Sequence, residues 1–236
     1  NLNEWISTLY INHTNYDEIL CGIPGKVCES KDSIYCPPLG QGIDVKTARK
    51  NRINIVNDML IHAYINPGIK YKGIRDIILT TSGTSIGLLL INHKFEYYKD
   101  TKYLKSYEFA HEKIIEYGLN NEIYKAIESK TGYKIEKFCS IYSVGGLAAF
   151  CGIDVDITKD GMFKIKDNEL IDMIYRKEIN LKLLKIWLKG LKKDLLFFFK
   201  KHDKTISKNI YLSGGLVNAF KDSDYSNLLS KEFNIL

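Results

Sequence analysis

Long apolar runs are missing from this sequence of 236 residues. A helix that crosses a bilayer needs about 18–20 consecutive, mainly apolar residues, and no stretch here approaches that length. The first residues also lack the basic and then apolar pattern of a secretory signal. We therefore expect a cytoplasmic protein without a membrane partner.

Metal-binding spacing is missing among the cysteines. The five cysteines are odd in number and form no C-x-x-C pair or Cys/His ligand pattern; they are Cys21, Cys28, Cys36, Cys139 and Cys151. We expect them to be reduced and mainly structural. The sequence therefore predicts no metal site built by the protein.

A concentrated charge of one sign is also missing. The net charge of +6 is spread over many lysines scattered among Ile, Asn and Tyr, which predicts no nucleic-acid partner. One basic stripe follows a helical spacing and comprises Lys182, Lys185, Lys189, Lys192 and Lys193. Such a stripe is typical of a solvated helix face, and a membrane-surface helix is the minor alternative.

The spacing of apolar residues along the chain predicts both helices and strands, as in an α/β protein. A content of 45% hydrophobic and 26% charged residues is ordinary for globular domains. Apolar residues at helical spacing predict helices at 2–10, 44–50, 119–130, 134–150 and 168–201. The fourth is expected to break around Gly145-Gly146, and Gly190 weakens the case for a continuous fifth. Short apolar runs that end in turn residues predict strands at 17–23, 53–56, 77–81, 88–91, 209–212 and 233–236. Residues 26–42 are expected to form a loop or an irregular hairpin.

Two of these strands end in residues suited to phosphoryl transfer. The strand from Ile53 runs into Asn57-Asp58, and the strand from Ile77 runs into a loop of small residues, 82–87. Gly83 and Gly87 would let that loop bring backbone N–H groups close to phosphate. A carboxylate that takes a hydroxyl proton and a loop that holds phosphates are the minimum set for transfer to an alcohol.

Six short motifs follow one another along the chain. They are Gly22-Ile23-Pro24-Gly25, Asn57-Asp58, Ser82-Gly83-Thr84-Ser85-Ile86-Gly87, Ile91-Asn92-His93-Lys94, Glu108-x-x-His111 and Leu212-Ser213-Gly214-Gly215-Leu216. Their order and spacing resemble the ROK family of sugar kinases and its bacterial glucokinase relatives, over nearly the whole chain. Each motif alone is common, whereas six in this order are hard to obtain by chance.

This resemblance implies a fold and an activity. The fold would be the actin-like (ribonuclease H-like) two-domain α/β ATPase fold, with sugar and ATP in a cleft between the lobes. The activity would be phosphorylation of a hexose or N-acetylhexosamine hydroxyl from ATP with Mg. The resemblance divides the chain into a small lobe at 1–68, incomplete at its start, and a large lobe at 69–236 without the closing helix. It also implies a homodimer.

The resemblance assigns roles to matching positions. Asp58 matches the catalytic base. The positions that match sugar-binding residues are Asn57, Glu108, His111 and Glu136. The positions that match ATP-binding glycines and their neighbour are Gly83, Thr84, Gly214 and Gly215. Glu108 and His111 would grip the sugar from one face of a helix that starts near Tyr107, with Ala110 in place of the family's glycine.

Some features of the family are missing. The first phosphate loop, Asp-x-Gly-Gly-Thr, does not occur, and no zinc-binding cysteine cluster stands near Thr131-Gly132. We therefore expect His111 to bind the sugar and not a metal ion. A different loop, 36–42, replaces the one that usually supplies an Asn and a Trp near the sugar, so the choice of sugar stays open.

Plainer interpretations stay open for each site residue. Asp58 could cap a helix that begins near Met59, which is compatible with catalysis. His111 could be an ordinary half-buried histidine, Glu108 and Glu136 could be surface charges, and Gly214-Gly215 could be only a strand-to-helix turn. A second alignment places Ser143 where Ser140 would follow Glu136. For the whole protein, the alternative is a sugar-responsive binding or regulatory protein that uses the same fold without turnover.

Overall fold

The computed structural model describes most of the chain. The described residues are 2–12, 15–23, 26–28, 33–36, 41–59, 61, 76–82, 85–91, 104–107, 109, 121–132, 139–159, 162–166, 168–202, 210–221, 223 and 225–235. The chain divides into two compact units, the first unit at residues 1–70 and the second unit at 71–236. Each unit has its own hydrophobic core.

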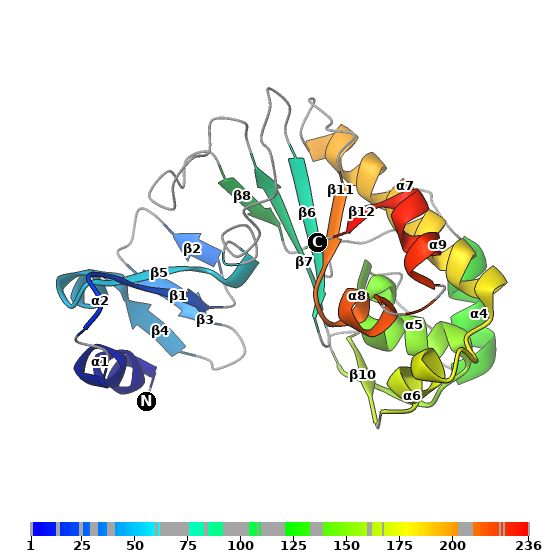
Figure 1. Cartoon of the computed structure of the whole chain (residues 1–236), viewed down its shortest axis with the longest axis horizontal. Coiled ribbons are helices and arrows are strands. Elements are labelled where there is room, and N and C mark those ends of the chain that lie inside the picture. Colours follow the sequence, from blue (N-terminus) through cyan, green and yellow to red (C-terminus); the bar gives the residue numbers. More distant parts are fainter. Residues whose placement is uncertain are drawn as a thin grey trace. The chain divides into compact units, whose positions relative to one another are not determined.

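The first unit combines a parallel strand pair with a small antiparallel sheet (Figure 1). Its elements are α1 (Leu2–Asn12), β1 (Ile19–Ile23), β2 (Lys26–Cys28), β3 (Ser33–Cys36), β4 (Gln41–Asp44), α2 (Val45–Lys50) and β5 (Ile53–Asn57). β1 pairs parallel with β5, and β2, β3 and β4 form an antiparallel sheet in that order. The region predicted as a loop or irregular hairpin is thus a three-stranded sheet.

Local chemistry explains why α2 begins where it does. Asp44 is its N-cap, and the carboxylate accepts hydrogen bonds from the Thr47 backbone N–H at 3.1 Å and the Thr47 hydroxyl at 2.7 Å. These bonds lower the pKa of Asp44. The core under α2 joins apolar side chains from α1, α2 and three strands, and its buried members are Ile6, Cys21, Ile23, Ile43, Val45, Ala48, Ile53 and Ile55.

The second unit is built on a five-stranded mixed sheet. The strands are β6 (Asp76–Ser82), β7 (Ser85–Ile91), β8 (Leu104–Tyr107), β11 (Ile210–Ser213) and β12 (Asn234–Ile235), in the spatial order β12-β11-β6-β7-β8. β6, β7 and β8 are antiparallel neighbours, whereas β11 lies parallel to both β6 and β12. A small hairpin, β9 (Val155–Ile157) with β10 (Phe163–Ile165), stands apart from this sheet.

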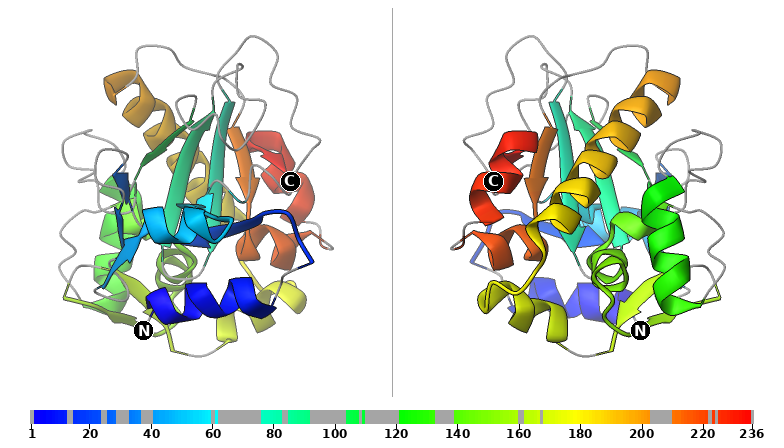
Figure 2. Two further views of the ribbon diagram at one scale, coloured as in Figure 1. Left: turned by 90° about the vertical axis from the view of Figure 1, so that its left-hand side faces the viewer. Right: turned by 90° about the vertical axis from the view of Figure 1, so that its right-hand side faces the viewer.

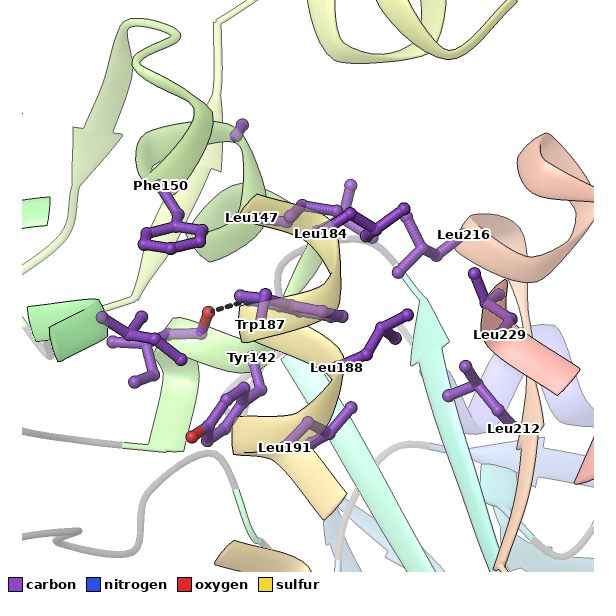
Figure 3. Close-up of a cluster of buried hydrophobic side chains, with 14 of the residues drawn as sticks. Tyr142, Leu147, Phe150, Leu184, Trp187, Leu188, Leu191, Leu212, Leu216 and Leu229 are labelled. Carbon is purple, nitrogen blue, oxygen red and sulfur yellow. Dashed lines mark hydrogen bonds between the residues drawn. The ribbon is translucent and has the colours of Figure 1, made fainter. Parts of the chain in front are cut away.

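Helices cover one side of the five-stranded sheet (Figure 1). They are α4 (Asn121–Thr131), the 3₁₀ helix η6 (Cys139–Tyr142), α5 (Val144–Cys151), α6 (Glu169–Tyr175), α7 (Leu181–His202), α8 (Gly215–Phe220) and α9 (Tyr225–Glu232). α7 crosses the sheet obliquely, as the right-hand view of Figure 2 shows. Its apolar stripe packs into the core between α5, α8 and α9, where the Trp187 indole donates a hydrogen bond to the Ile141 carbonyl at 3.0 Å (Figure 3).

Two predicted helix boundaries are wrong. The helix predicted at 134–150 breaks at Ser143, whose hydroxyl caps α5 by accepting from the Gly146 N–H at 3.0 Å, so Gly145-Gly146 lie inside the first turn. The long helix predicted at 168–201 breaks between α6 and α7, where Asn180 caps α7 by accepting from the N–H groups of Lys182 and Leu183. α7 continues through Gly190.

The loop predicted at 82–87 is also shorter in the structure. Ser85, Ile86 and Gly87 belong to β7, with Gly87 paired opposite Thr80. Gly87 therefore contributes to the antiparallel ladder and not to a phosphate loop. On its other side, β7 pairs with β8.

Candidate functional site

Asp58 stands at the end of a parallel strand pair, which is where ligands of α/β proteins collect. β5 ends at Asn57, opposite Ile23 at the end of β1, and the chain turns into a helical segment at Asp58 and Met59. Asn57 is placed by its backbone only, so its predicted contact with the sugar stays a prediction. β5 and β6, the two strands whose ends were predicted to carry the chemistry, belong to different sheets in different units.

The Asp58 carboxylate is half-buried and has one oxygen engaged locally. Its Oδ1 accepts a hydrogen bond from the Met59 N–H at 2.9 Å. Within the part of the chain that is described, no hydrogen bond involves Oδ2. The hydrogen bond to Oδ1 thus orients the carboxylate, and Oδ2 remains able to accept a proton.

Gly22 of β1 brings the Asp58 turn close to the strand. A Cβ at this glycine would lie 2.5 Å from Ile61 Cγ1 and 3.2 Å from Asp58 Cα. Real side chains almost never approach at 2.5 Å, so any larger residue would push the turn away from β1. Because Gly22 has no Cβ, Ile61 and the backbone of Asp58 can pack closely against β1.

A pocket of about 750 Å³ opens beside Asp58 within the first unit. Its walls are mainly apolar, and it is lined by Trp5, Leu9, Tyr16, Glu18, Ile19, Leu20, Cys21, Gly22, Asp58 and Ile61. Among the described lining residues, Glu18 and Asp58 carry carboxylates, and there is no lysine or arginine. Burial raises the pKa of the Cys21 thiol, which therefore stays protonated and unreactive at neutral pH.

The predicted ATP-side glycines form the turn between β11 and α8 in the second unit. Gly214 has a φ of 100°, a conformation that only glycine adopts readily, and a Cβ at Gly215 would meet nothing within 4 Å. Just before them, the Ser213 hydroxyl is buried and has no hydrogen-bond partner among the described residues. A polar atom buried without a partner is expensive, so a ligand bound at this turn could supply the Ser213 hydroxyl with one.

The remaining predicted site residues lie outside the described residues; they are Gly83, Thr84, Glu108, His111 and Glu136. Tyr107 is the last residue of β8, and the segment in which a helix was expected to follow falls mainly outside the described residues. Ser140, expected four residues after Glu136, is fully buried in η6, and Ser143 caps α5.

Sequence reasoning missed three contributors to these sites. Gly22 was read only as part of a turn, although its close approach to Ile61 requires a glycine. Ser213 was read as one letter of a motif, and only its burial beside Gly214 marks it as unusual. Trp5 could have been suspected, because it is a large aromatic side chain that stays 51% exposed on α1.

The described part of the chain holds no group of three or more His, Cys, Asp or Glu side chains that could bind a metal ion. Among those same residues, no helix is long and apolar enough to cross a membrane.

Comparisons with known proteins match the fold and not the sequence. No protein-family model and no curated protein matches the chain. Among solved structures, a glucokinase from an Antarctic psychrotroph matches with a TM-score of 0.50 and 12% identity, over 97% of this chain and 74% of that one. A ROK family protein from Streptococcus pneumoniae TIGR4 in complex with sucrose matches with a TM-score of 0.49 and 15% identity, over 98% and 74%.

A glucokinase from Balamuthia mandrillaris in complex with glucose matches with a TM-score of 0.48 and 9% identity, over 99% and 78%. At identities this low, structural likeness speaks for the fold alone. The match to the Antarctic glucokinase confirms the fold class predicted from the sequence motifs. The chain therefore has the actin-like α/β fold found in glucokinases.

Proposed function

We propose that this protein is a sugar kinase that transfers a phosphoryl group from ATP to a hydroxyl of a hexose or an N-acetylhexosamine. The observation that carries the proposal is the half-buried Asp58 carboxylate at the end of the β1–β5 pair, oriented through Oδ1 and lining a pocket. The fold adds support, because it is that of glucokinases. The motif order read from the sequence is independent support.

The proposed role of Asp58 is that of a general base. A sugar hydroxyl placed within hydrogen-bond reach of Oδ2 would give up its proton to the carboxylate as its oxygen attacks phosphorus. The Met59 N–H holds Oδ1 and so keeps the carboxylate in one orientation during the transfer. Positioning of this kind supplies much of the rate in phosphoryl transfer, since the protein does little covalent chemistry.

The turn at Gly214-Gly215 fits a bound nucleotide. Neither glycine presents a Cβ, the space above Gly215 is open, and the buried Ser213 hydroxyl lacks a described partner. When bound, Mg-ATP supplies the transferable phosphoryl group. Mg²⁺ is usually carried by substrate phosphates with one or two carboxylates, and the described residues form no larger ligand cluster, so the ion would arrive with the nucleotide.

The other roles inferred from the resemblance are part of this proposal. Asn57, Glu108, His111 and Glu136 would bind the sugar, and Gly83 and Thr84 would hold phosphate at the β6–β7 turn. The protein would act as a cytoplasmic homodimer without a nucleic-acid or membrane partner. None of these positions has a described side chain, so the proposal does not depend on them.

The Asp58→Asn variant tests the proposed activity. Asparagine keeps a side-chain oxygen that can accept from the Met59 N–H but cannot take a proton, so the turn should keep its shape. We expect kcat for ATP-dependent sugar phosphorylation to fall by roughly 10²–10⁴ while KM changes little. The measurement is a coupled assay over a panel of hexoses and N-acetylhexosamines.

An acidic residue in the same unit provides the matched control. Asp44→Asn changes an exposed carboxylate that caps α2 and is not among the residues that line the pocket beside Asp58, so kcat should stay within about twofold of wild type. An Asp58→Asn protein as active as Asp44→Asn would remove the general base. Sugar binding without turnover in the wild-type protein would favour the regulatory alternative.

A further inference from the structure

One buried stripe of α7 carries a charged residue among apolar ones. Its members lie on the same face of the helix because they follow one another at steps of four, three and four residues; they are Trp187, Leu191, Asp194 and Phe198. Each of the four is at most 1% exposed. Burying a carboxylate among apolar side chains is costly unless hydrogen bonds compensate, which marks Asp194 as more than a packing residue.

The stripe holds the 3₁₀ helix η6 at two points. The Trp187 indole N–H donates to the Ile141 carbonyl at 3.0 Å, and the Tyr142 hydroxyl donates to Asp194 Oδ2. The rings of Tyr142 and Trp187 also meet edge to face, with their centroids 5.9 Å apart (Figure 3). All four residues are buried, so water competes little for these hydrogen bonds, and the bonds fix the place of η6 on α7.

The same stripe packs against Phe109, which is far from η6 in the sequence. The rings of Phe198 and Phe109 meet edge to face with their centroids 5.3 Å apart, and both side chains are almost fully buried. On the same helix, the Phe199 ring meets Phe198 edge to face, also at 5.3 Å, and so restricts its orientation. α7 therefore fixes two separate segments of the second unit from one face.

Both segments adjoin residues that the proposed function assigns to the sugar. Phe109 directly follows Glu108 in the chain and precedes His111 by two residues, and η6 begins three residues after Glu136. A fixed residue limits how far its neighbours in the chain can move, because consecutive Cα atoms are only about 3.8 Å apart. The contacts of α7 therefore limit the freedom of both sugar-binding segments.

We propose that Trp187, Asp194 and Phe198 are positioning residues for the sugar. From one face of α7 they hold η6 and Phe109, so that the sugar-binding residues next to each segment reach hydroxyls of one sugar ring at the same time. A site that is held in its binding geometry before the ligand arrives binds more tightly. The three side chains are buried and act through these segments. This inference rests on the proposed function, which supplies the sugar.

Calorimetric titration of the whole chain with glucose and with N-acetylglucosamine tests the proposal. Trp187→Phe and Asp194→Ala each remove one hydrogen bond to η6. Phe198→Leu removes the ring that meets Phe109. Each variant should weaken the binding of the sugar that the wild type prefers by roughly 5–10-fold, because small displacements of positioned groups are costly. ATP affinity should stay within about twofold, and equal loss of both ligands would overturn the proposal by showing a purely structural role.

Two further variants test the Asp194–Tyr142 hydrogen bond without emptying space in the core. Asp194→Asn keeps a side-chain oxygen that can accept from the Tyr142 hydroxyl, so its sugar affinity should lie within about threefold of wild type. Tyr142→Phe keeps the ring and should lose several-fold; it carries this test alone if Asp194→Ala does not fold. The Tyr142→Phe/Asp194→Ala double variant should lose no more than Asp194→Ala, because both changes remove one bond. Additive losses would contradict the proposed role of this bond.

Leu188 supplies the matched control on the same helix. It is fully buried, and in Figure 3 its side chain points to the side where Leu216 and Leu229 lie, away from Tyr142. Leu188→Ala leaves a cavity and should lower the stability of the second unit in urea. Its sugar affinity should nonetheless stay within about twofold of wild type, because η6 and Phe109 keep their contacts with α7. A loss of sugar affinity as large as that of Asp194→Ala would overturn the proposal.

Failure of this inference and failure of the proposed function give different results. Wild-type protein that binds neither sugar contradicts the proposed function, and the inference fails with it. Sugar binding by the wild type that stays unchanged in Trp187→Phe, Asp194→Ala and Phe198→Leu overturns the inference alone. Sugar binding without phosphorylation contradicts the kinase activity alone, and weaker binding in the three variants would then still support the positioning role.

Discussion

The close packing of Ile61 and Asp58 against β1 requires a glycine at position 22. Gly22→Ala would place a methyl group 2.5 Å from Ile61 Cγ1, so the Ile61 side chain or the backbone at Asp58 must shift away from β1. We expect the first unit to lose about 1–3 kcal/mol of stability, as overpacked sites do. Sugar phosphorylation should fall with it, because a small displacement of a catalytic group is costly. Urea unfolding and a kinase assay measure the two effects.

Gly42 of β4 supplies the control for that substitution. A Cβ at Gly42 would meet nothing within 4 Å, so Gly42→Ala should change neither stability nor activity noticeably. Ile61→Ala removes the clashing atom and should restore part of the activity of Gly22→Ala in the double variant. Equal behaviour of the two glycine variants would show that the close approach of β1 to Ile61 has no importance.

We expect a substitution of Ser213 to have opposite effects on stability and on ligand binding. Its buried hydroxyl has no described partner, so Ser213→Ala should leave the second unit as stable or make it more stable by about 1 kcal/mol. If the hydroxyl serves a nucleotide at the Gly214 turn, ATP affinity should fall by about fivefold or more in the same variant. Thermal unfolding and calorimetric titration give the two numbers. Unchanged ATP affinity would remove Ser213 from the site.

At the scale of elements, α5 depends on two glycines that the sequence had suggested as a break. A Cβ at Gly146 would lie 2.2 Å from the Ile141 carbonyl oxygen, which belongs to the backbone and cannot rotate away. Replacing a glycine in a helix by alanine ordinarily stabilises by up to about 1 kcal/mol. Here the sign should reverse, and Gly146→Ala should cost about 1–3 kcal/mol in denaturant unfolding. Gly215→Ala, where the space is open, is the control.

The same element shows how far the sequence could predict the fold. Strands such as β5 and β6 were predicted nearly to the residue, because their apolar runs end sharply at turn residues. The break before α5 was misplaced, since nothing local tells whether a glycine pair ends a helix or packs against a neighbouring carbonyl. Asn180 was missed as the cap of α7, because the apolar pattern continues across the break.

For the candidate site, Asp58 could be predicted and its surroundings could not. A carboxylate after a strand is visible in the sequence, and so is the glycine turn after β11. The contact of Gly22 with Ile61 joins positions that are far apart in the chain, and only the folded structure shows it. The parallel pairing of β1 with β5 likewise joins segments that are far apart in the chain.

At the scale of the whole molecule, the two units should unfold separately. Each has its own core, and the core of the second unit is much larger. The two tryptophans report one unit each, since Trp5 lies in the first and the fully buried Trp187 in the second. In guanidinium chloride, Trp5 fluorescence in the Trp187→Phe protein should report a lower unfolding midpoint than Trp187 fluorescence in the Trp5→Phe protein. Coincident midpoints would mean that the units are one cooperative body.

The place of β11 in its sheet has a consequence for synthesis on the ribosome. β11 inserts beside β6, yet it follows β6 in the chain by roughly 130 residues, which take on the order of ten seconds to translate. During that interval the β6–β7–β8 meander exists with the edge of β6 unprotected, and unprotected edges recruit other strands. The nascent chain should therefore need a chaperone most between the appearance of β8 and that of β11.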